Sequence, residues 1–516
     1  MDFAAMTCKK KTAVSTLLFM ASLALFHSPA AYSHQDGSHE AFTSEESTHW
    51  IWKEIRHNQQ QNQQKHEAGL SIPAVVSTEE DESKEGKSSG TGHGQPFEIE
   101  NNPENLAKAL YFAINYQCWS EVKRLLAVYQ KIPESNPLLV DFAQGGLARI
   151  EGKLALSAAH YQKILSQQPN STRIKLELAR VYFEDYNNRE AEKLFSELRE
   201  QHQLPKIVLE NIDRYLHAIP LRSRWHSSFS ISSVYDDNLN MTPNQEAQCL
   251  LILEGHCLMQ RKLPKIIKEW GSTYTATLSR RYSFAGHHGV FGRALIYGEN
   301  YPHYHDANEN IFLLVSGYNY KNRTHDLSFG PLFEYKQSAG KTEYYALGAK
   351  LEWQWAMTAQ TGLNVEISNK RLNYQQNDSV KNGALSSSYF SLSHFINDKV
   401  ILFGGGQWSY QDSQRPSSRY QQWGVTAGIA GQIYSGINGS LVATLRQLRF
   451  AAYNAVLEAR RQDNEQIYTA SIKFPKAKIV GMTPSLIFRH RHNRSNVDWL
   501  YSYDKNQVQI QLEKYF

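Results

Sequence analysis

The chain ends in the stretch NQVQIQLEKYF, residues 506–516, in which apolar and polar side chains alternate. Val508, Ile510, Leu512 and Phe516 fall on one face, and glutamine and glutamate residues fall on the other. A period of two predicts a β-strand with one apolar and one polar face. A last strand that ends on an aromatic residue is typical of an outer-membrane β-barrel, because that strand must pair with the first one to close the sheet.

The same alternation recurs upstream and continues from Pro220 to the end of the chain. From residue 345 to residue 355, for example, every second residue is aromatic or aliphatic. We expect about 14 strands, an even number, as in single-chain bacterial barrels. The expected ranges are 223–238, 266–282, 287–300, 308–320, 324–337, 342–355, 358–371, 385–395, 398–411, 420–432, 436–449, 463–475, 480–493 and 505–516.

Closure of such a barrel makes the first and last expected strands neighbours. The seam would then bring Val234 and Tyr235 to the strand that carries Val508, Ile510, Leu512 and Phe516. A soluble sandwich with its polar face in water would show the same alternation. Aromatic residues at the ends of so many strands favour the membrane barrel.

The overall composition agrees with a membrane barrel. The 516 residues include 29 Tyr and 10 Trp, and 41% of all residues are hydrophobic. Mean hydropathy is −0.53, and no run of about 20 apolar residues follows the amino terminus, so no transmembrane helix is expected. The formal net charge is +5, and no basic stripe with interleaved aromatics occurs, which excludes nucleic acid as an expected partner.

The amino terminus predicts a signal peptide over residues 1–33. Lys9 to Lys11 form a positive segment, Val14 to Phe26 an apolar one, and Ala31 to Ser33 supply small residues for cleavage. Residues 34–100 are polar and of low complexity, which predicts a disordered leader. Export implies an oxidising compartment, so we expect a disulfide between Cys249 and Cys257.

Residues 101–219 change to a helical period and predict a small solenoid. Three segments repeat at a spacing of about 33 residues, close to that of a tetratricopeptide repeat. Ala113, Gly146 and Ala179 take equivalent positions, where a small residue lets two helices approach. A capping helix is expected over residues 204–219. Two roles remain open for this solenoid, a groove that binds a peptide or protein and a scaffold that packs on the next domain.

The residue patterns predict no catalytic residue, no metal site and no cofactor. No G-x-S-x-G, P-loop, H-E-x-x-H or C-x-x-C motif occurs. The densest histidine clusters, residues 303–306 and 490–492, could hold a metal, but loop or strand-end positions explain them more simply. A Ser-His-Asp site assembled from distant strands stays open, although nothing points to one. The expected loop 239–265 is long and would face the cell exterior.

The architecture resembles the surface lipoprotein assembly modulator (Slam) family over residues 104–516. The local matches are Val234 to Asn240 on the first strand and Ser502 to Asn506 before the last. The terminal Phe also resembles the signal that the barrel assembly machinery recognises. The leader, residues 34–100, matches nothing in the family. The resemblance implies an outer-membrane translocator, with a periplasmic solenoid and residues 220–516 as the barrel.

The partners that the resemblance implies are a surface lipoprotein or a secreted haem-binding client, together with outer-membrane lipid, periplasmic chaperones and the barrel assembly machinery. An exopolysaccharide export porin is an alternative, because such porins also join helical repeats to a barrel. Their solenoids are usually longer than three repeats. A barrel enzyme or a passive pore with an accessory solenoid is the third class left open.

Overall fold

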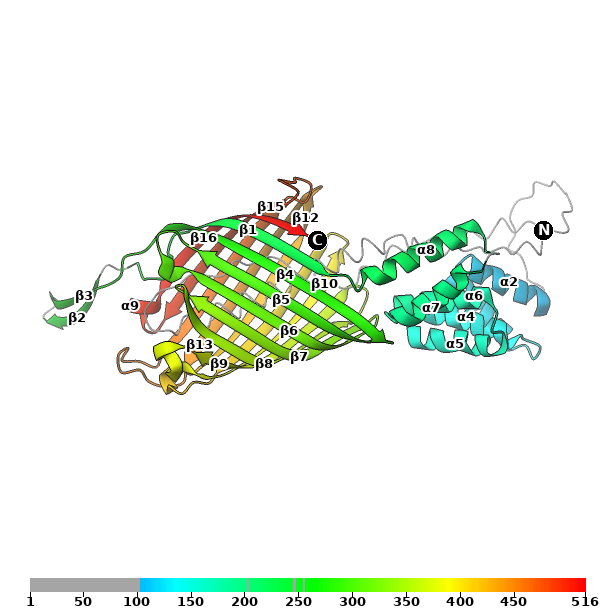
Figure 1. Cartoon of the computed structure of the whole chain (residues 1–516), viewed down its shortest axis with the longest axis horizontal. Helices are drawn as coiled ribbons and strands as arrows, with labels where there is room; N and C mark the ends of the chain where they lie inside the picture. Colours follow the sequence, from blue (N-terminus) through cyan, green and yellow to red (C-terminus); the bar gives the residue numbers. More distant parts are fainter. Residues whose placement is uncertain (1–102, 202–203, 245–246, 254–255) are drawn as a thin grey trace. The chain divides into compact units, whose positions relative to one another are not determined.

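A computed structural model describes residues 103–201, 204–244, 247–253 and 256–516 (Figure 1). The chain divides into two compact units, a helical unit and a β-barrel. The predicted signal peptide, residues 1–33, and the predicted leader, residues 34–100, lie outside the described residues.

In the part of the chain that the structure describes, the helical unit contains three helix pairs and a capping helix. Their bounds are α2 Pro103–Asn115, α3 Trp119–Tyr129, α4 Pro137–Ile150, α5 Leu154–Gln167, α6 Thr172–Glu184, α7 Asn188–Arg199 and α8 Lys206–Leu221. The predicted fold of this part, three tetratricopeptide-like pairs and a cap, is confirmed. The last helix extends one residue past Pro220, so the expectation that this proline ends the helical part was slightly wrong. Pro220 has no backbone N–H to donate to the preceding turn, so one backbone hydrogen bond is missing at the end of this helix.

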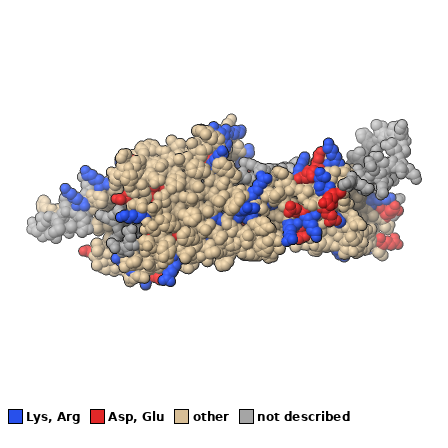
Figure 2. All heavy atoms as spheres, viewed as in Figure 1, with Lys and Arg blue, Asp and Glu red and all other residues tan. Residues whose placement is uncertain are grey.

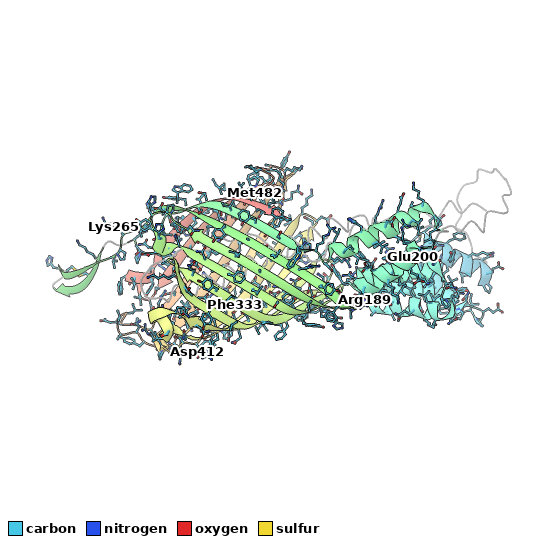
Figure 3. The ribbon with its side chains drawn as sticks, viewed as in Figure 1. Arg189, Glu200, Lys265, Phe333, Asp412 and Met482 are labelled. Atoms are coloured by element: carbon cyan, nitrogen blue, oxygen red, sulfur yellow. A yellow bond between two sulfur atoms is a disulfide. The ribbon has the colours of Figure 1, made fainter. Side chains whose placement is uncertain are left out.

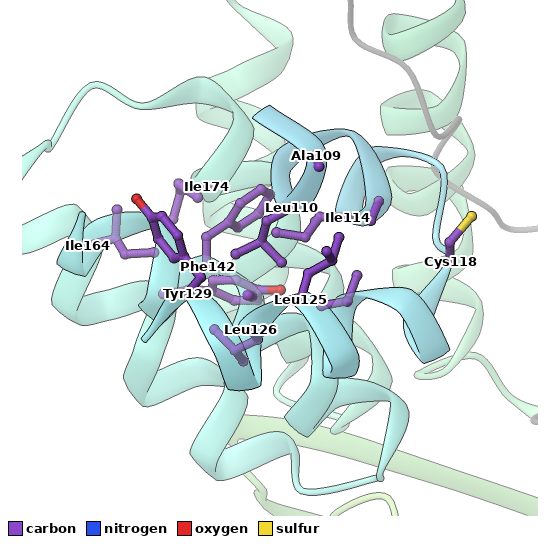
Figure 4. Packing of buried hydrophobic residues seen from close by; sticks show 14 of the residues in the cluster. Ala109, Leu110, Ile114, Cys118, Leu125, Leu126, Tyr129, Phe142, Ile164 and Ile174 are labelled. Carbon is purple, nitrogen blue, oxygen red and sulfur yellow. The ribbon is translucent and has the colours of Figure 1, made fainter. Parts of the chain in front are cut away.

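The first two helix pairs and helix α6 bury one continuous apolar core (Figure 4). Leu110, Val122 and Leu125 are almost fully buried there, and Phe142 packs beside Tyr161 with ring centroids 6.3 Å apart. Gly146 is required by this packing, because a Cβ at that position would lie 2.6 Å from an atom of the Trp119 ring. The small residues of the repeat therefore act as the sequence predicted, by letting neighbouring helices approach.

The second unit is a closed antiparallel barrel of 14 strands, which confirms the predicted fold class. Its strands are β1 His226–Asp236, β4 Glu269–Ala285, β5 His288–Asn300, β6 Glu309–Lys321, β7 His325–Ser338, β8 Lys341–Ala356, β9 Thr361–Tyr374, β10 Gly383–Asn397, β11 Val400–Gln411, β12 Tyr420–Tyr434, β13 Ile437–Phe450, β14 Gln462–Lys473, β15 Thr483–Ser495 and β16 Tyr503–Tyr515. In Figure 1 the red strand β16 lies beside the green strand β1, where the sheet closes.

Alternate residues of each strand face the outer wall and the lumen. Leu347, Phe390 and Ile510 are more than half exposed on the outer wall, whereas Lys336 and Glu334 on the inner wall are almost fully buried. Figure 2 shows the middle of one barrel face almost without charged residues. Phe333, labelled on β7 in Figure 3, belongs to the outward set. An apolar wall around a polar interior is the arrangement that a lipid bilayer requires.

The connections at the two ends of the barrel differ in length. At the end where β1 begins, here called the turn end, most are short, such as residues 286–287 and 322–324. At the opposite end, the loop end, most are long, such as residues 375–382 and 451–461. The longest expected loop is not irregular throughout: it contains a separate hairpin, β2 Ala247–Leu253 and β3 His256–Lys262.

Candidate functional site

The barrel seam joins the first and last strands over nine residue pairs, from Ser228 opposite Tyr515 to Asp236 opposite Gln507. The register sets Val234 opposite Gln509, Tyr235 opposite Val508, Ser233 opposite Ile510 and Ile231 opposite Leu512. Phe516 lies just beyond the last pair, and its backbone N–H donates to the carbonyl of Ser227 at 2.9 Å. All six residues expected at the seam are therefore brought together there.

These seam residues do not share one environment. Val234 is fully buried and packs with Leu239 and Tyr301 at the loop end. Tyr235 lies on the other face, with its ring 5.1 Å from that of Trp270. Val508, Ile510 and Phe516 are exposed on the outer wall, as a lipid-facing strand requires.

A polar network holds the loop end of the seam. Lys505 Nζ lies 2.6 Å from Asp236 Oδ2, and both side chains are almost completely buried. The same carboxylate oxygen accepts a bond of 2.9 Å from Gln507 Nε2. Asp237 accepts the backbone N–H and the side-chain amide of Asn506 at 2.6 and 2.8 Å. These bonds therefore join the two segments that carry the family resemblance, residues 234–240 and 502–506.

Buried ion pairs line the rest of the inner wall. The side chains of five such ion pairs are each less than 10% exposed. The pairs are Lys336 with Glu309 at 3.4 Å and Glu343 at 3.0 Å, Lys350 with Glu366 at 3.1 Å, Lys370 with Glu334 at 2.9 Å and Arg491 with Glu465 at 3.1 Å. Charges removed from water are stable only when they are paired in this way. The charged side chains of these pairs are therefore held in place on the lumen wall.

The helical unit carries a second group of buried charges. Asp141 is 3% exposed and accepts bonds from Lys163 at 2.7 Å and His160 at 3.0 Å. Burial opposes ionisation of Asp141, but the bonds from Lys163 and His160 outweigh it, so the pKa of this carboxyl is lowered. Burial also raises the pKa of Tyr215 to about 12, and its ring stacks on Phe195 at 4.7 Å. These groups serve the packing of the solenoid.

Three aromatic side chains are exposed on and just after helix α2. Tyr111 is 45% exposed, Phe112 39% and Tyr116 60%. The rings of Tyr111 and Phe112 meet edge to face, with centroids 6.4 Å apart. We call these three residues the α2 aromatic surface. Large aromatic residues that are partly exposed on a helical repeat are typical of a protein-binding surface.

Cys249 and Cys257 are joined by a disulfide between β2 and β3, with Cα atoms 5.8 Å apart. Cys118 is buried just before α3, and its Sγ lies 3.8 Å from the carbonyl oxygen of Tyr116. The bridge links the two strands of this hairpin, which would be only marginally stable in water without a covalent link.

Neither histidine cluster is assembled into a metal site. His303 lies 3.2 Å from Glu269, whereas His490 and His492 bond Asn506 and Asp504 across the β15–β16 pair at 2.8 and 2.6 Å. Within the described ranges, no group of three or more His, Cys, Asp or Glu residues could hold a metal ion. Nor does the same part of the chain contain a helix long and apolar enough to cross a membrane.

The sequence did not reveal the Lys505–Asp236 pair or the partners of the lumen charges. Each pair joins residues from different strands, and alternation assigns a face but not a partner. The only available signal was the presence of charged residues on the face opposite the aromatics.

Comparisons with known proteins cover both units. The family profile described as surface lipoprotein assembly modifier matches residues 225–516, and the profile of its N-terminal TPR repeats matches residues 93–195. A hemophilin secretion modulator of Acinetobacter baumannii is 35% identical over 438 residues, which cover 82% of this chain and 88% of the relative. Surface lipoprotein assembly modifier 1 of Neisseria meningitidis serogroup B is 23% identical over 435 residues, covering 80% and 83% of the two chains.

Solved structures match far less closely. The outer membrane channel DcaP of Acinetobacter baumannii gives a TM-score of 0.34 at 11% identity, over 57% of this chain and 96% of the channel. OccAB3 of the same species gives 0.31 at 8% identity, over 57% and 99%. Scores this low carry no argument about function.

Proposed function

The chain belongs to the surface lipoprotein assembly modifier family, and from that premise we propose that it delivers a specific client protein across the outer membrane to the cell surface. The observation that carries the proposal is the match to the hemophilin secretion modulator, which extends over 82% of the chain and so covers both the solenoid and the barrel. A closed barrel of 14 strands with an apolar outer wall lies in the outer membrane. The resemblance to the family supports a periplasmic location for the solenoid, which we include in the proposal.

The client that we propose is a secreted haem-binding protein. The hemophilin secretion modulator is 35% identical to this chain, whereas the surface lipoprotein assembly modifier 1 is 23% identical over a similar length. A surface lipoprotein is the alternative client. Periplasmic chaperones would present the client, and the barrel assembly machinery would insert the barrel that carries it.

We assign the first contact with the client to the solenoid, and within it to the α2 aromatic surface. Tyr111 and Tyr116 combine a large apolar ring with a hydroxyl that can bond in a partly wet interface. Such residues supply much of the binding energy in protein interfaces, because they lose little conformational entropy when they are covered. We assign no catalytic role to any of the described residues, and the activity that we propose is transport.

The test is co-expression of the chain in Escherichia coli with A. baumannii hemophilin and with each secreted or lipidated protein encoded beside its gene. The full chain should place one of these clients in the medium or on the surface, measured by immunoblot and flow cytometry. Deletion of residues 104–219 should leave that client in the periplasm, while heat-modifiable mobility in gels shows that the barrel still folds.

A finer test replaces Tyr116 with Ser, because this ring is 60% exposed and supports no core. Export should fall severalfold, whereas Ile207→Ser, at a position of α8 that is 55% exposed, should leave export unchanged. Export that survives the deletion would refute the role of the solenoid. A full chain that exports none of the clients, and conducts as a large open pore in planar bilayers, would favour the polysaccharide porin.

A further inference from the structure

One connection at the turn end is much longer than the others. Residues 474–482 join β14 to β15 and number nine, whereas the other five connections between strands at this end have two to four residues. We call residues 474–482 the turn-end hairpin, and Figure 3 labels Met482 within it, at the edge of the barrel. Two residues are enough to join antiparallel strands, so closure of the sheet does not require the extra length.

The tip of the turn-end hairpin is a defined two-residue turn. Ile479 and Met482 exchange two backbone hydrogen bonds of 2.9 Å, and Val480 and Gly481 between them have φ angles of 50° and 73°. Such a turn favours Asn followed by Gly, because both central residues need a positive φ. Valine is branched at Cβ and is disfavoured in that region. Val480 is 90% exposed, so neither the turn nor a core accounts for its side chain.

Three exposed lysines surround this tip. Lys476 and Lys478 precede it in the chain, and Lys514 of β16 lies beside it, since a Cβ built on Gly481 would be 3.9 Å from Lys514 Nζ. Lys476 and Lys478 each donate to a neutral hydroxyl, which for Lys476 is that of Ser435 at 2.7 Å. The hairpin contains no Asp or Glu. Figure 2 shows Lys and Arg atoms at the edge of the barrel where Figure 3 labels Met482, so this edge is cationic.

Exposed apolar side chains flank the lysines. Ile479 is 51% exposed, and Ile433 and Tyr434, at the end of β12, are 69% and 72% exposed. The β12–β13 turn lies against the hairpin, because Lys476 bonds Ser435 within that turn. Since β12 is part of the lipid-facing wall, the apolar surface of that wall continues onto the hairpin at the rim of the barrel.

We propose that the turn-end hairpin binds an anionic phospholipid of the adjoining membrane leaflet. The ammonium groups contact the phosphate of the headgroup, and the side chains of Ile479 and Val480 enter the outer part of the acyl layer. Apolar side chains among lysines bind a membrane surface in this way, because apolar area and anionic charge both contribute. Charge complementarity and continuity with the lipid-facing wall favour lipid over a protein as the occupant.

The proposal rests on the location of the barrel in the outer membrane and is independent of the client, since none of its residues belongs to the solenoid. A zwitterionic phospholipid offers the same apolar layer without net charge. The lysines therefore predict a preference between two lipids that differ only in the headgroup, and this preference can be measured without any export.

The test uses the full-length protein in detergent micelles and native mass spectrometry with phosphatidylglycerol and phosphatidylcholine of the same acyl chains. The native protein should bind phosphatidylglycerol at least about fivefold more tightly, since each lysine near an anionic lipid surface contributes a factor of about five. Lys476→Gln with Lys478→Gln should weaken phosphatidylglycerol at least about tenfold and leave phosphatidylcholine unchanged. Lys265→Gln with Lys341→Gln removes the same charge from exposed lysines at the loop end and should keep the native preference.

Val480→Asn tests the apolar tip separately from the turn. Asn-Gly suits this turn better than Val-Gly, so the hairpin should stay folded while the affinity for both lipids falls severalfold. Val456→Asn, at a valine of the β13–β14 loop that is 76% exposed, should leave both affinities unchanged. Heat-modifiable gel mobility shows that the barrel of each variant has folded.

Equal affinity of the native protein for the two lipids would overturn the proposal, as would an equal loss in the two lysine double variants. Native lipid binding by Val480→Asn would contradict insertion of the tip. If Lys476→Gln with Lys478→Gln binds both lipids like the native protein but exports less client, the hairpin contacts a protein and the lipid proposal is wrong. Loss of the lipid preference with unchanged export supports it and leaves the proposed transport intact.

Discussion

Replacing Asp236 with Asn is expected to destabilise the barrel by about 3–5 kcal/mol, the usual cost of breaking a buried ion pair from one side. The change keeps the shape of the side chain, and its Oδ1 can still accept the backbone N–H of Asn238, a bond of 3.0 Å in the native protein. It leaves the ammonium group of Lys505, which is 1% exposed, without the carboxylate that lies 2.6 Å away. The loss is therefore that of a buried charge without its counter-ion.

The assay is guanidinium-induced unfolding in detergent micelles, followed by tryptophan fluorescence. Asp412→Asn provides the matched control, because Asp412 pairs with Arg419 at 2.9 Å but the two side chains are 48% and 39% exposed. An exposed pair is worth about 0–1 kcal/mol, so the control should unfold close to the native barrel.

The double variant Asp236→Asn with Lys505→Gln removes both charges together. Its free energy of unfolding should fall by much less than the sum of the two single changes, since no buried charge is left unpaired. The reasoning is refuted if Asp236→Asn costs less than about 1 kcal/mol, or if the double variant loses the full sum.

Three further changes test other parts of the chain. Gly146→Ala should lower the stability of the solenoid by about 1–3 kcal/mol in urea unfolding, because the added Cβ meets the Trp119 ring; an unchanged midpoint would contradict that packing. Because the pKa of Asp141 is lowered, its contribution to stability is complete above its unfolded pKa of about 3.9 and is lost as pH falls through the folded value. The melting temperature of Asp141→Asn should therefore fall less steeply at acidic pH than that of the native protein, and Lys163→Gln should show part of this effect. Cys249→Ser should speed proteolysis of the β2–β3 hairpin and leave the unfolding of the barrel unchanged, since the bridge closes a loop of only 8 residues outside the barrel sheet.

Strand positions could be predicted from the sequence because alternation is local. All 14 expected ranges overlap observed strands, and the range for β16 differs by two residues at its start and one at its end. The same local signal could not show the β2–β3 hairpin, because its first strand, AQCLLIL, is an apolar run that does not alternate. Nor could it show the partner of Lys336, which pairs with Glu309 on a different strand.

The seam shows why the two segments that carried the family resemblance matter physically. Its outer face, with Val508, Ile510 and Phe516, contacts lipid. The free energy of transferring these side chains from water to lipid is the same in every strand register that keeps them on the outer face. A slip of two residues preserves the alternation of faces, so the apolar pattern alone cannot choose between such registers. The same slip would separate Lys505 from Asp236 and leave two charges buried without partners, which is costly. The polar residues at the loop end therefore fix how the last strand closes the barrel.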